Sequence, residues 1–198
     1  MSFRQGARQF FERRGAPTPP LPYDAEVEYV AIGARQICNL RIQPTVESLF
    51  KVRAAFVTRS GDIHFGIKVS EYTNFRIFYN GSLYFDLGDY YHQGGRCYIS
   101  NFPYRTVKDM EFGNNYIKVD GAEVVSKTTS TTTLAQSDFL LGGDGASNVY
   151  SAQLTTGGVF QRDLIPVRLG TAGYFYDRVS KTIFGATTGS LTPGPDKS

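Results

Sequence analysis

The chain has 198 residues, of which 41% are hydrophobic and 14% aromatic, and this length and composition fit one domain with a sizeable core. Its 21 glycines and 9 prolines, together with few long helical patterns, favour short strands joined by turns. The formal net charge of +3 arises largely in residues 1–14, so the rest of the chain lacks the basic face of a nucleic-acid-binding protein, and no run approaches the roughly twenty apolar residues that cross a bilayer.

Residues 1–22 are expected to form an arm that precedes the domain. Large apolar and basic residues recur there at helical spacing and predict a short basic amphipathic helix, followed by an extended, proline-rich spacer. The residues that define the arm are Phe3, Phe10, Phe11 and Arg14. A helix this short is marginal in water unless it packs on something. We therefore predict a docking or oligomerisation arm, with a partly disordered terminus as the alternative.

Residues 23–198 show a different pattern, in which short runs of alternating apolar residues are separated by turn residues. Helix is expected to be scarce in this domain. The first two predicted strand faces, separated by a break at Gly33, are Val27, Tyr29 and Ala31, and then Cys38, Leu40 and Ile42. Further strands are predicted at 49–58, 63–69, 75–79, 83–87, 151–154 and 162–168, with three more between 96 and 125 and a strand followed by a turn at 173–180.

Two turn signals stand out between these strands. Asn80-Gly81 predicts a type I′ hairpin, because both central positions of that turn need positive φ. Asp120-Gly121 predicts a second turn later in the chain. Both turns are expected to join neighbouring antiparallel strands.

Three segments of the second half resemble a known family. KVDGAEVV at 118–125 is similar to a hairpin, and 162–168 and 173–180 are similar to two strand elements, of the laminin-G-like, concanavalin-A-type jelly-roll domains of phage and prophage structural proteins of gut bacteria. The resemblance extends from about Tyr23 to Asp196. It implies an all-β fold, a two-sheet antiparallel jelly-roll sandwich, which the short N-terminal helix would precede.

The same resemblance implies a function. It points to a non-enzymatic structural or adhesion module of a phage or prophage particle, such as a tail, baseplate or fibre component. The expected partners are other virion proteins or further copies of the chain in a homo-oligomer. Because the sequence shows no secretory signal pattern, the expected location is a virion assembled in the host cytoplasm. The alternative is a lectin-like carbohydrate-binding protein at the bacterial cell surface or outside the cell; no nucleic-acid partner and no membrane insertion are expected.

The segment DYYHQGGR at 89–96 holds the best candidates for binding a glycan. If it is extended, Tyr90 and Tyr91 place their rings on opposite faces, so at least one ring is exposed. An exposed ring can stack on a sugar while His92 and Arg96 hydrogen-bond its hydroxyls. Alternatively, these tyrosines fill a core or a turn, and the chain has no tryptophan, a residue often used to stack on sugars.

Asp109 and Glu111 are the one tight acid pair on a predicted strand, and at positions i and i+2 they would share a strand face. A retaining glycoside hydrolase needs two carboxyls about 5 Å apart, but the E-x-D-x-x-E array typical of such enzymes is absent. His64 and His92 lie in no known nucleophile motif. The sequence therefore predicts no enzymatic activity and a solvated outer face for the acid pair, with a hydrolase as the least favoured alternative.

No metal or other cofactor is predicted. Some laminin-G-like domains bind Ca²⁺ through loop carboxylates, which Asp86, Asp89 and Asp144 could supply here, but no calcium motif points to them. Cys38 and Cys97 also lack metal-ligand spacing. They are expected to be two buried thiols, with a disulfide left open if folding takes place in an oxidising compartment.

Overall fold

The computed structural model describes residues 20–59, 62–67, 74–88, 96–113, 116–126 and 134–198. These residues form strands, turns and connecting segments, and no helix occurs among them. The predicted all-β fold is therefore confirmed for this part of the chain. The predicted arm residues Phe3, Phe10, Phe11 and Arg14 lie outside the described residues, as do Asp89, Tyr90, Tyr91 and His92.

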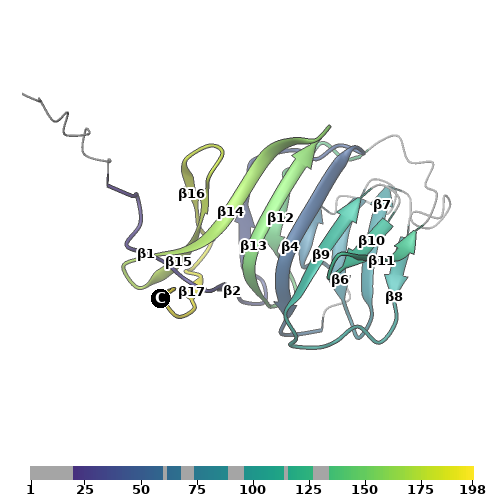
Figure 1. Ribbon diagram of the computed structural model, residues 1–198, viewed down its shortest axis with the longest axis horizontal. Helices are drawn as coiled ribbons and strands as arrows, with labels where there is room; N and C mark the ends of the chain where they lie inside the picture. The colour runs from purple at the N-terminus through teal and green to yellow at the C-terminus, as the bar shows by residue number, and fades with distance from the viewer. Residues whose placement is uncertain (1–19, 60–61, 68–73, 89–95, 114–115, 127–133) are drawn as a thin grey trace, which may run out of the picture.

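Two antiparallel sheets form a β-sandwich (Figure 1). The main path of the large sheet runs through β11 (Ala122–Ser126), β10 (Tyr116–Val119), β9 (Lys108–Gly113), β4 (Ser48–Phe56), β13 (Ser147–Thr156), β14 (Val159–Leu169), β15 (Ala172–Asp177) and β16 (Thr182–Phe184). β1 (Ala25–Glu26) joins β14, β2 (Val30–Ile32) joins β13, and β17 (Thr192–Pro193) joins β2. The small sheet has the order β3 (Ile37–Asn39), β12 (Leu140–Gly142), β5 (Phe65–Ile67), β6 (Asn74–Tyr79), β7 (Leu83–Gly88) and β8 (Arg96–Ile99).

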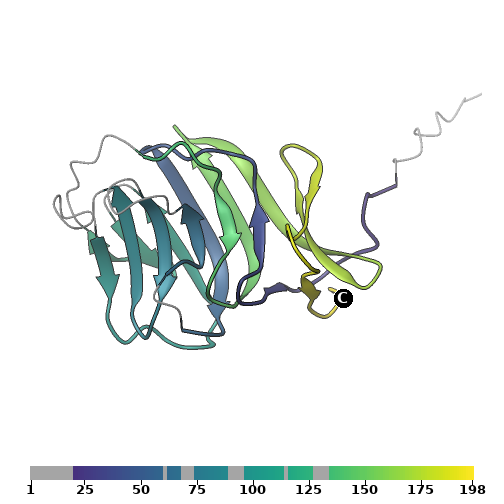
Figure 2. The same ribbon diagram turned by 180° about the vertical axis from the view of Figure 1, so that it is seen from behind.

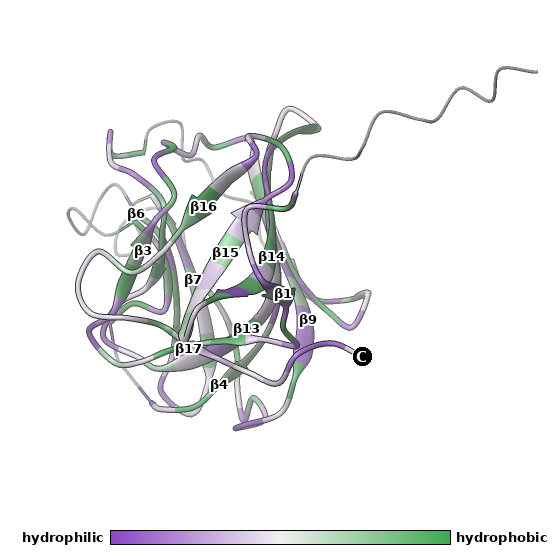
Figure 3. Cartoon of the chain, turned by 90° about the vertical axis from the view of Figure 1, so that its left-hand side faces the viewer, coloured by the Kyte–Doolittle hydropathy of each residue, from purple (hydrophilic) through white to green (hydrophobic). Residues whose placement is uncertain are grey.

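The large sheet extends past the small one on the side of the C-terminus. Figures 1 and 2 show β15, β16, β1 and β17 beyond the edge of the small sheet. On the other side, β8 of the small sheet lies against β11 of the large sheet. Figure 3 shows hydrophilic and hydrophobic segments within single strands, as expected where one face of each strand is buried.

Aromatic rings fill much of the space between the sheets. Phe50 of β4 contacts Phe65 of β5 and Phe139 just before β12, with ring centroids 5.8 and 4.8 Å apart. Phe112 of β9 meets Phe85 of β7 at 5.5 Å. Aromatic pairs of this kind contribute roughly 0.5–1.5 kcal/mol each beyond the area they bury. The inward faces of both sheets are therefore committed to the core, and their outer faces are where a ligand could bind.

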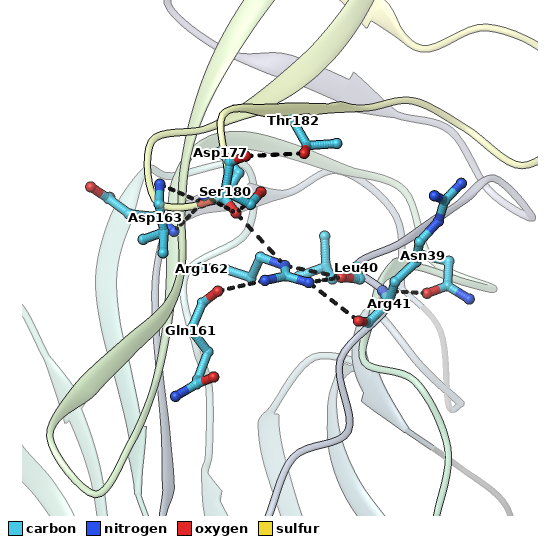
Figure 4. Close-up of polar contacts among 10 residues, drawn as sticks. Asn39, Leu40, Arg41, Gln161, Arg162, Asp163, Asp177, Ser180 and Thr182 are labelled. Carbon is cyan, nitrogen blue, oxygen red and sulfur yellow. Dashed lines mark hydrogen bonds and ion pairs between the residues drawn. The ribbon is translucent and has the colours of Figure 1, made fainter.

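Arg162 bridges the two sheets at the edge formed by β3 (Figure 4). Its side chain leaves β14, and Nε and Nη2 donate to the carbonyl oxygen of Leu40 at 3.0 and 2.8 Å. Nη2 also donates to the carbonyl of Arg41 at 3.2 Å, and Nε lies 3.8 Å from a carboxylate oxygen of Asp177. One side chain thus donates hydrogen bonds to the backbone carbonyls of the two residues that follow β3.

Asp177 organises the turn after β15. Its buried carboxylate accepts hydrogen bonds from the backbone N–H groups of Asp163, Val179 and Ser180 and from the Ser180 hydroxyl, at 2.6–3.2 Å. Burial by itself raises the pKa of Asp177, but these hydrogen bonds outweigh it, so the pKa lies below its ordinary value. The segments 162–168 and 173–180 therefore have a structural role in this molecule.

The first predicted strand face is wrong. β2 buries Val30 and Ile32, whereas Tyr29 and Ala31 are only partly buried. The reason is that β1 pairs with β14 while β2 pairs with β13, so the chain changes neighbours after Val27 and the alternation does not continue.

The two turn predictions have different outcomes. Tyr79 pairs with Leu83, so the connection contains three residues, and Gly81, with φ 110°, is its only position with positive φ. The predicted type I′ hairpin is therefore wrong. Asp120 and Gly121 have φ values of 51° and 82°, and this tight turn joins β10 to β11 as predicted.

Cys38 and Cys97 are both buried and form no disulfide, which confirms the expectation of two buried thiols. They belong to β3 and β8, the opposite edge strands of the small sheet, so a disulfide is out of reach. Burial raises the pKa of Cys38 to about 12. In the second predicted face, Leu40 is buried as well, and Ile42 packs against the core from a partly buried position.

Candidate functional site

The outer face of the small sheet carries two parallel rows of side chains, which we call the aromatic–arginine surface. Cross-strand pairing aligns β6, β7 and β8, so that residues directly opposite one another form each row. The polar row is Arg76, Asp86 and Arg96, and the aromatic row is Phe78, Tyr84 and Tyr98. The residues that alternate with them on β6, Phe75 and Ile77, point into the core.

Asp86 is the centre of the polar row. Its carboxylate is fully buried and accepts hydrogen bonds from Nε of Arg76 at 3.1 Å and from Nε and Nη2 of Arg96 at 2.6 and 2.9 Å. Arg76 also reaches Asp62 at 3.2 Å. Bidentate pairing fixes a guanidinium in both position and orientation. Arg96 is therefore held rigidly, although a third of its side chain remains exposed.

The aromatic row becomes more exposed toward the edge strand. Phe78 and Tyr84 stack with centroids 4.6 Å apart and an interplanar angle of 2°, and Tyr98 continues the stack at 5.8 Å. Phe78 is buried, whereas Tyr98 is 57% exposed. The Arg96 guanidinium lies 5.4 Å from the Tyr84 ring centroid. The arrangement presents an aromatic ring beside a fixed cation, which can stack on the apolar face of a ring-shaped ligand and hydrogen-bond its polar edge.

Of the predicted glycan-binding residues, Arg96 belongs to this surface, while Tyr90, Tyr91 and His92 are not described. Tyr84 and Tyr98 were not predicted from the sequence. A usable signal for Tyr98 was its position two residues after Arg96 on one strand, which places both side chains on one face. Nothing in the sequence reports the pairing that brings Tyr84 beside them.

Asp109 and Glu111 share the outer face of β9, as predicted, but each is neutralised by a cation. Arg53 contacts Asp109 at 3.1 Å, and Lys51 contacts Glu111 at 2.9 Å. Burial raises the pKa of Glu111, but hydrogen bonds from the Tyr116 hydroxyl and Lys51 outweigh this effect and hold the pKa below its ordinary value. Glu111 is therefore an ionised, ion-paired carboxylate, unlike the proton donor with a raised pKa that glycoside hydrolysis requires.

His64 is fully buried ahead of β5. Its Nδ1 accepts a hydrogen bond from the Tyr79 backbone N–H at 3.3 Å, so the proton of the neutral ring belongs on Nε2, which lies 3.2 Å from the Thr58 carbonyl. Burial lowers the pKa of His64 to about 4. Both ring nitrogens are thus occupied by backbone groups, and the residue holds the fold together.

No group of three or more His, Cys, Asp or Glu side chains with the geometry of a metal site occurs in the described ranges. Within the calcium set considered from the sequence, Asp86 is engaged by two arginines and Asp89 is not described. None of the described residues belongs to a helix long and apolar enough to cross a membrane. Comparison with protein-family models, curated proteins and solved structures finds no match to this chain.

Proposed function

We propose that this chain is a non-enzymatic structural or adhesion module of a phage or prophage particle, a tail, baseplate or fibre component, with a jelly-roll fold of the laminin-G-like type. The β-sandwich and the crossovers in its strand order are compatible with that fold. The sequence resemblance at 118–125, 162–168 and 173–180 supports the particle role. In this role the arm at 1–22 anchors the domain to other virion proteins or to further copies of the chain.

The module binds host-surface glycan through the aromatic–arginine surface. The observation that carries this proposal is the exposed Tyr98 ring, stacked on Tyr84 beside a guanidinium that buried Asp86 holds in place. Tyrosine supplies a flat apolar face for a sugar ring, and the guanidinium supplies donors for hydroxyl groups. Because the ion pairs fix these side chains before a ligand binds, little conformational entropy is lost on binding.

A glycan microarray probed with the full chain tests the proposal. Replacing Tyr98 with alanine removes the stacking face and is expected to weaken binding roughly two- to tenfold, since an aromatic contact contributes about 0.5–1.5 kcal/mol. Phe160→Ala is the matched control, because Phe160 is 50% exposed at the start of β14, away from this surface. Equal losses for both variants, or no bound glycan at all, would contradict a glycan site at Tyr98.

The second candidate function is a lectin-like carbohydrate-binding protein of the bacterium itself, which the same surface would serve. The two candidates differ in where the chain resides and how it assembles. A particle component copurifies with phage particles and forms a larger assembly by light scattering that is lost in a chain starting at Tyr23. A free-standing lectin is a monomer in both forms and is found at the cell surface.

A further inference from the structure

A hollow of about 370 Å³ lies on the outer face of the large sheet, where β10, β9, β4 and β13 lie side by side (Figure 1). Its main lining side chains are Lys51, Arg53, Asp109, Glu111, Lys118 and Gln153. A second hollow, of about 380 Å³, shares Arg53 with the first and is lined also by Glu28, Tyr150 and Lys197. We treat the two adjoining hollows as one feature and call it the polar groove.

A β-bulge joins the two hollows. The pairing of β13 with β4 shifts register between Val149 and Ser151. As a result, the consecutive residues Tyr150 and Ser151 both line the outer face, one in each hollow. Bulges commonly re-aim a side chain at a functional site. Here the bulge adds an aromatic ring beside the charged and amide side chains of the groove.

The lining alternates in charge from strand to strand. In one row, Lys118 and Lys51 flank Glu111 at 3.5 and 2.9 Å. In the next row, Arg53 pairs with Asp109 at 3.1 Å. These side chains remain accessible, since those of Lys51, Arg53 and Asp109 are 48%, 52% and 58% exposed.

This alternation selects the class of ligand. A polyanion would meet the carboxylates of Asp109 and Glu111, and a polycation would meet the lysines and Arg53. An apolar ligand would strip water from charged groups without replacing their hydrogen bonds. Hydroxyl groups both donate and accept, so a neutral chain of hydroxylated rings can satisfy each position in turn. With strands about 4.8 Å apart, crossing four of them takes roughly 14 Å, which is enough for more than one ring.

We infer that the polar groove binds a neutral oligosaccharide, which lies across the strands from Tyr150 toward Lys118. The groove is on the opposite sheet from the aromatic–arginine surface and uses none of its residues, so this inference goes beyond the proposed function and can fail independently of it. Because Glu111 is ionised and ion-paired, it does not supply the proton donor that cleavage of a bound oligosaccharide would require.

The test uses the full chain and a panel of soluble probes: cello-, xylo-, malto- and chito-oligosaccharides as neutral ligands and an oligogalacturonate as the acidic one. Titration calorimetry is expected to show that a neutral probe binds, and that Arg53→Gln and Gln153→Ala each weaken its binding roughly tenfold, because each removes a hydrogen-bonding group. Arg178→Gln is the matched control, since Arg178 is also 52% exposed and paired with an aspartate at 2.8 Å but does not line the groove.

A second measurement does not depend on any variant folding. Amide hydrogen exchange of the unsubstituted chain with the bound neutral probe is expected to slow in β4 and β9, whether or not the probe also protects the aromatic–arginine surface on β7 and β8. The inference is overturned if no neutral probe binds, if oligogalacturonate binds more tightly, or if protection falls on the small sheet and not on β4 and β9. Neutral-probe binding that Tyr98→Ala abolishes and Arg53→Gln does not would retain the proposed function and overturn the groove.

Discussion

The two outer faces of the sandwich use cross-strand ion pairs in opposite ways. On the small sheet, Arg76 and Arg96 converge on one carboxylate, that of Asp86, which has no exposed surface. On the large sheet, pairs such as Arg53 with Asp109 alternate across strands and remain about half exposed. Buried charges are costly to leave unpaired, whereas exposed pairs contribute little to stability. The first arrangement therefore holds side chains rigidly in place, and the second leaves polar groups available to a ligand.

The largest expected effect comes from breaking the buried cluster. Asp86→Asn removes the charge that Arg76 and Arg96 share, and we expect it to lower the free energy of unfolding by about 3–5 kcal/mol. Urea denaturation followed by fluorescence measures this change. A loss below about 1 kcal/mol, the range of surface pairs, would remove the distinction between the two faces.

The small sheet is also stabilised by the buried, neutral His64 side chain, and protonation of this side chain at low pH should destabilise the fold. The pKa of His64 is about 4 in the folded chain against an ordinary value of 6.5, so the unfolded chain binds the proton more readily. The contribution of neutral His64 to the free energy of unfolding is complete above pH 6.5. It falls by roughly 3 kcal/mol as the pH drops to about 4.

Urea midpoints measured across that pH range check the prediction. His64→Gln is the comparison variant, because it has no group that titrates there. It is expected to be less stable at neutral pH and to show a shallower pH dependence than the unsubstituted chain. Parallel pH profiles for the two proteins would show that His64 titrates normally in the folded state.

The smallest expected effect concerns the exposed pairs of the large sheet. Asp109→Asn removes the partner of Arg53, and we expect the free energy of unfolding to fall by less than about 1 kcal/mol. Added salt should shrink the difference further, because it screens exposed charges. A salt-independent loss as large as that of Asp86→Asn would mean that this face is part of the stabilising framework.

Sequence reasoning succeeded where one strand or one turn contained the whole signal. Alternation at two-residue spacing was enough to place Asp109 and Glu111 on one face of β9. Asp120-Gly121 was enough for a tight turn, since both residues tolerate positive φ. The same reasoning failed at Asn80-Gly81, where the pairing of Tyr79 with Leu83 sets a three-residue connection.

The sequence by itself determined the all-β class, most strand positions and the burial of both cysteines, because these follow from local alternation, glycine placement and hydrophobicity. Only the tertiary structure decided which strands are neighbours and in which register. Those choices bring Arg96 to Asp86 and Tyr84 to Tyr98, and they alternate the charges along the polar groove. The physical reason is that pairing energy comes from side chains distant in the chain, which meet only after the two sheets have packed on a common core.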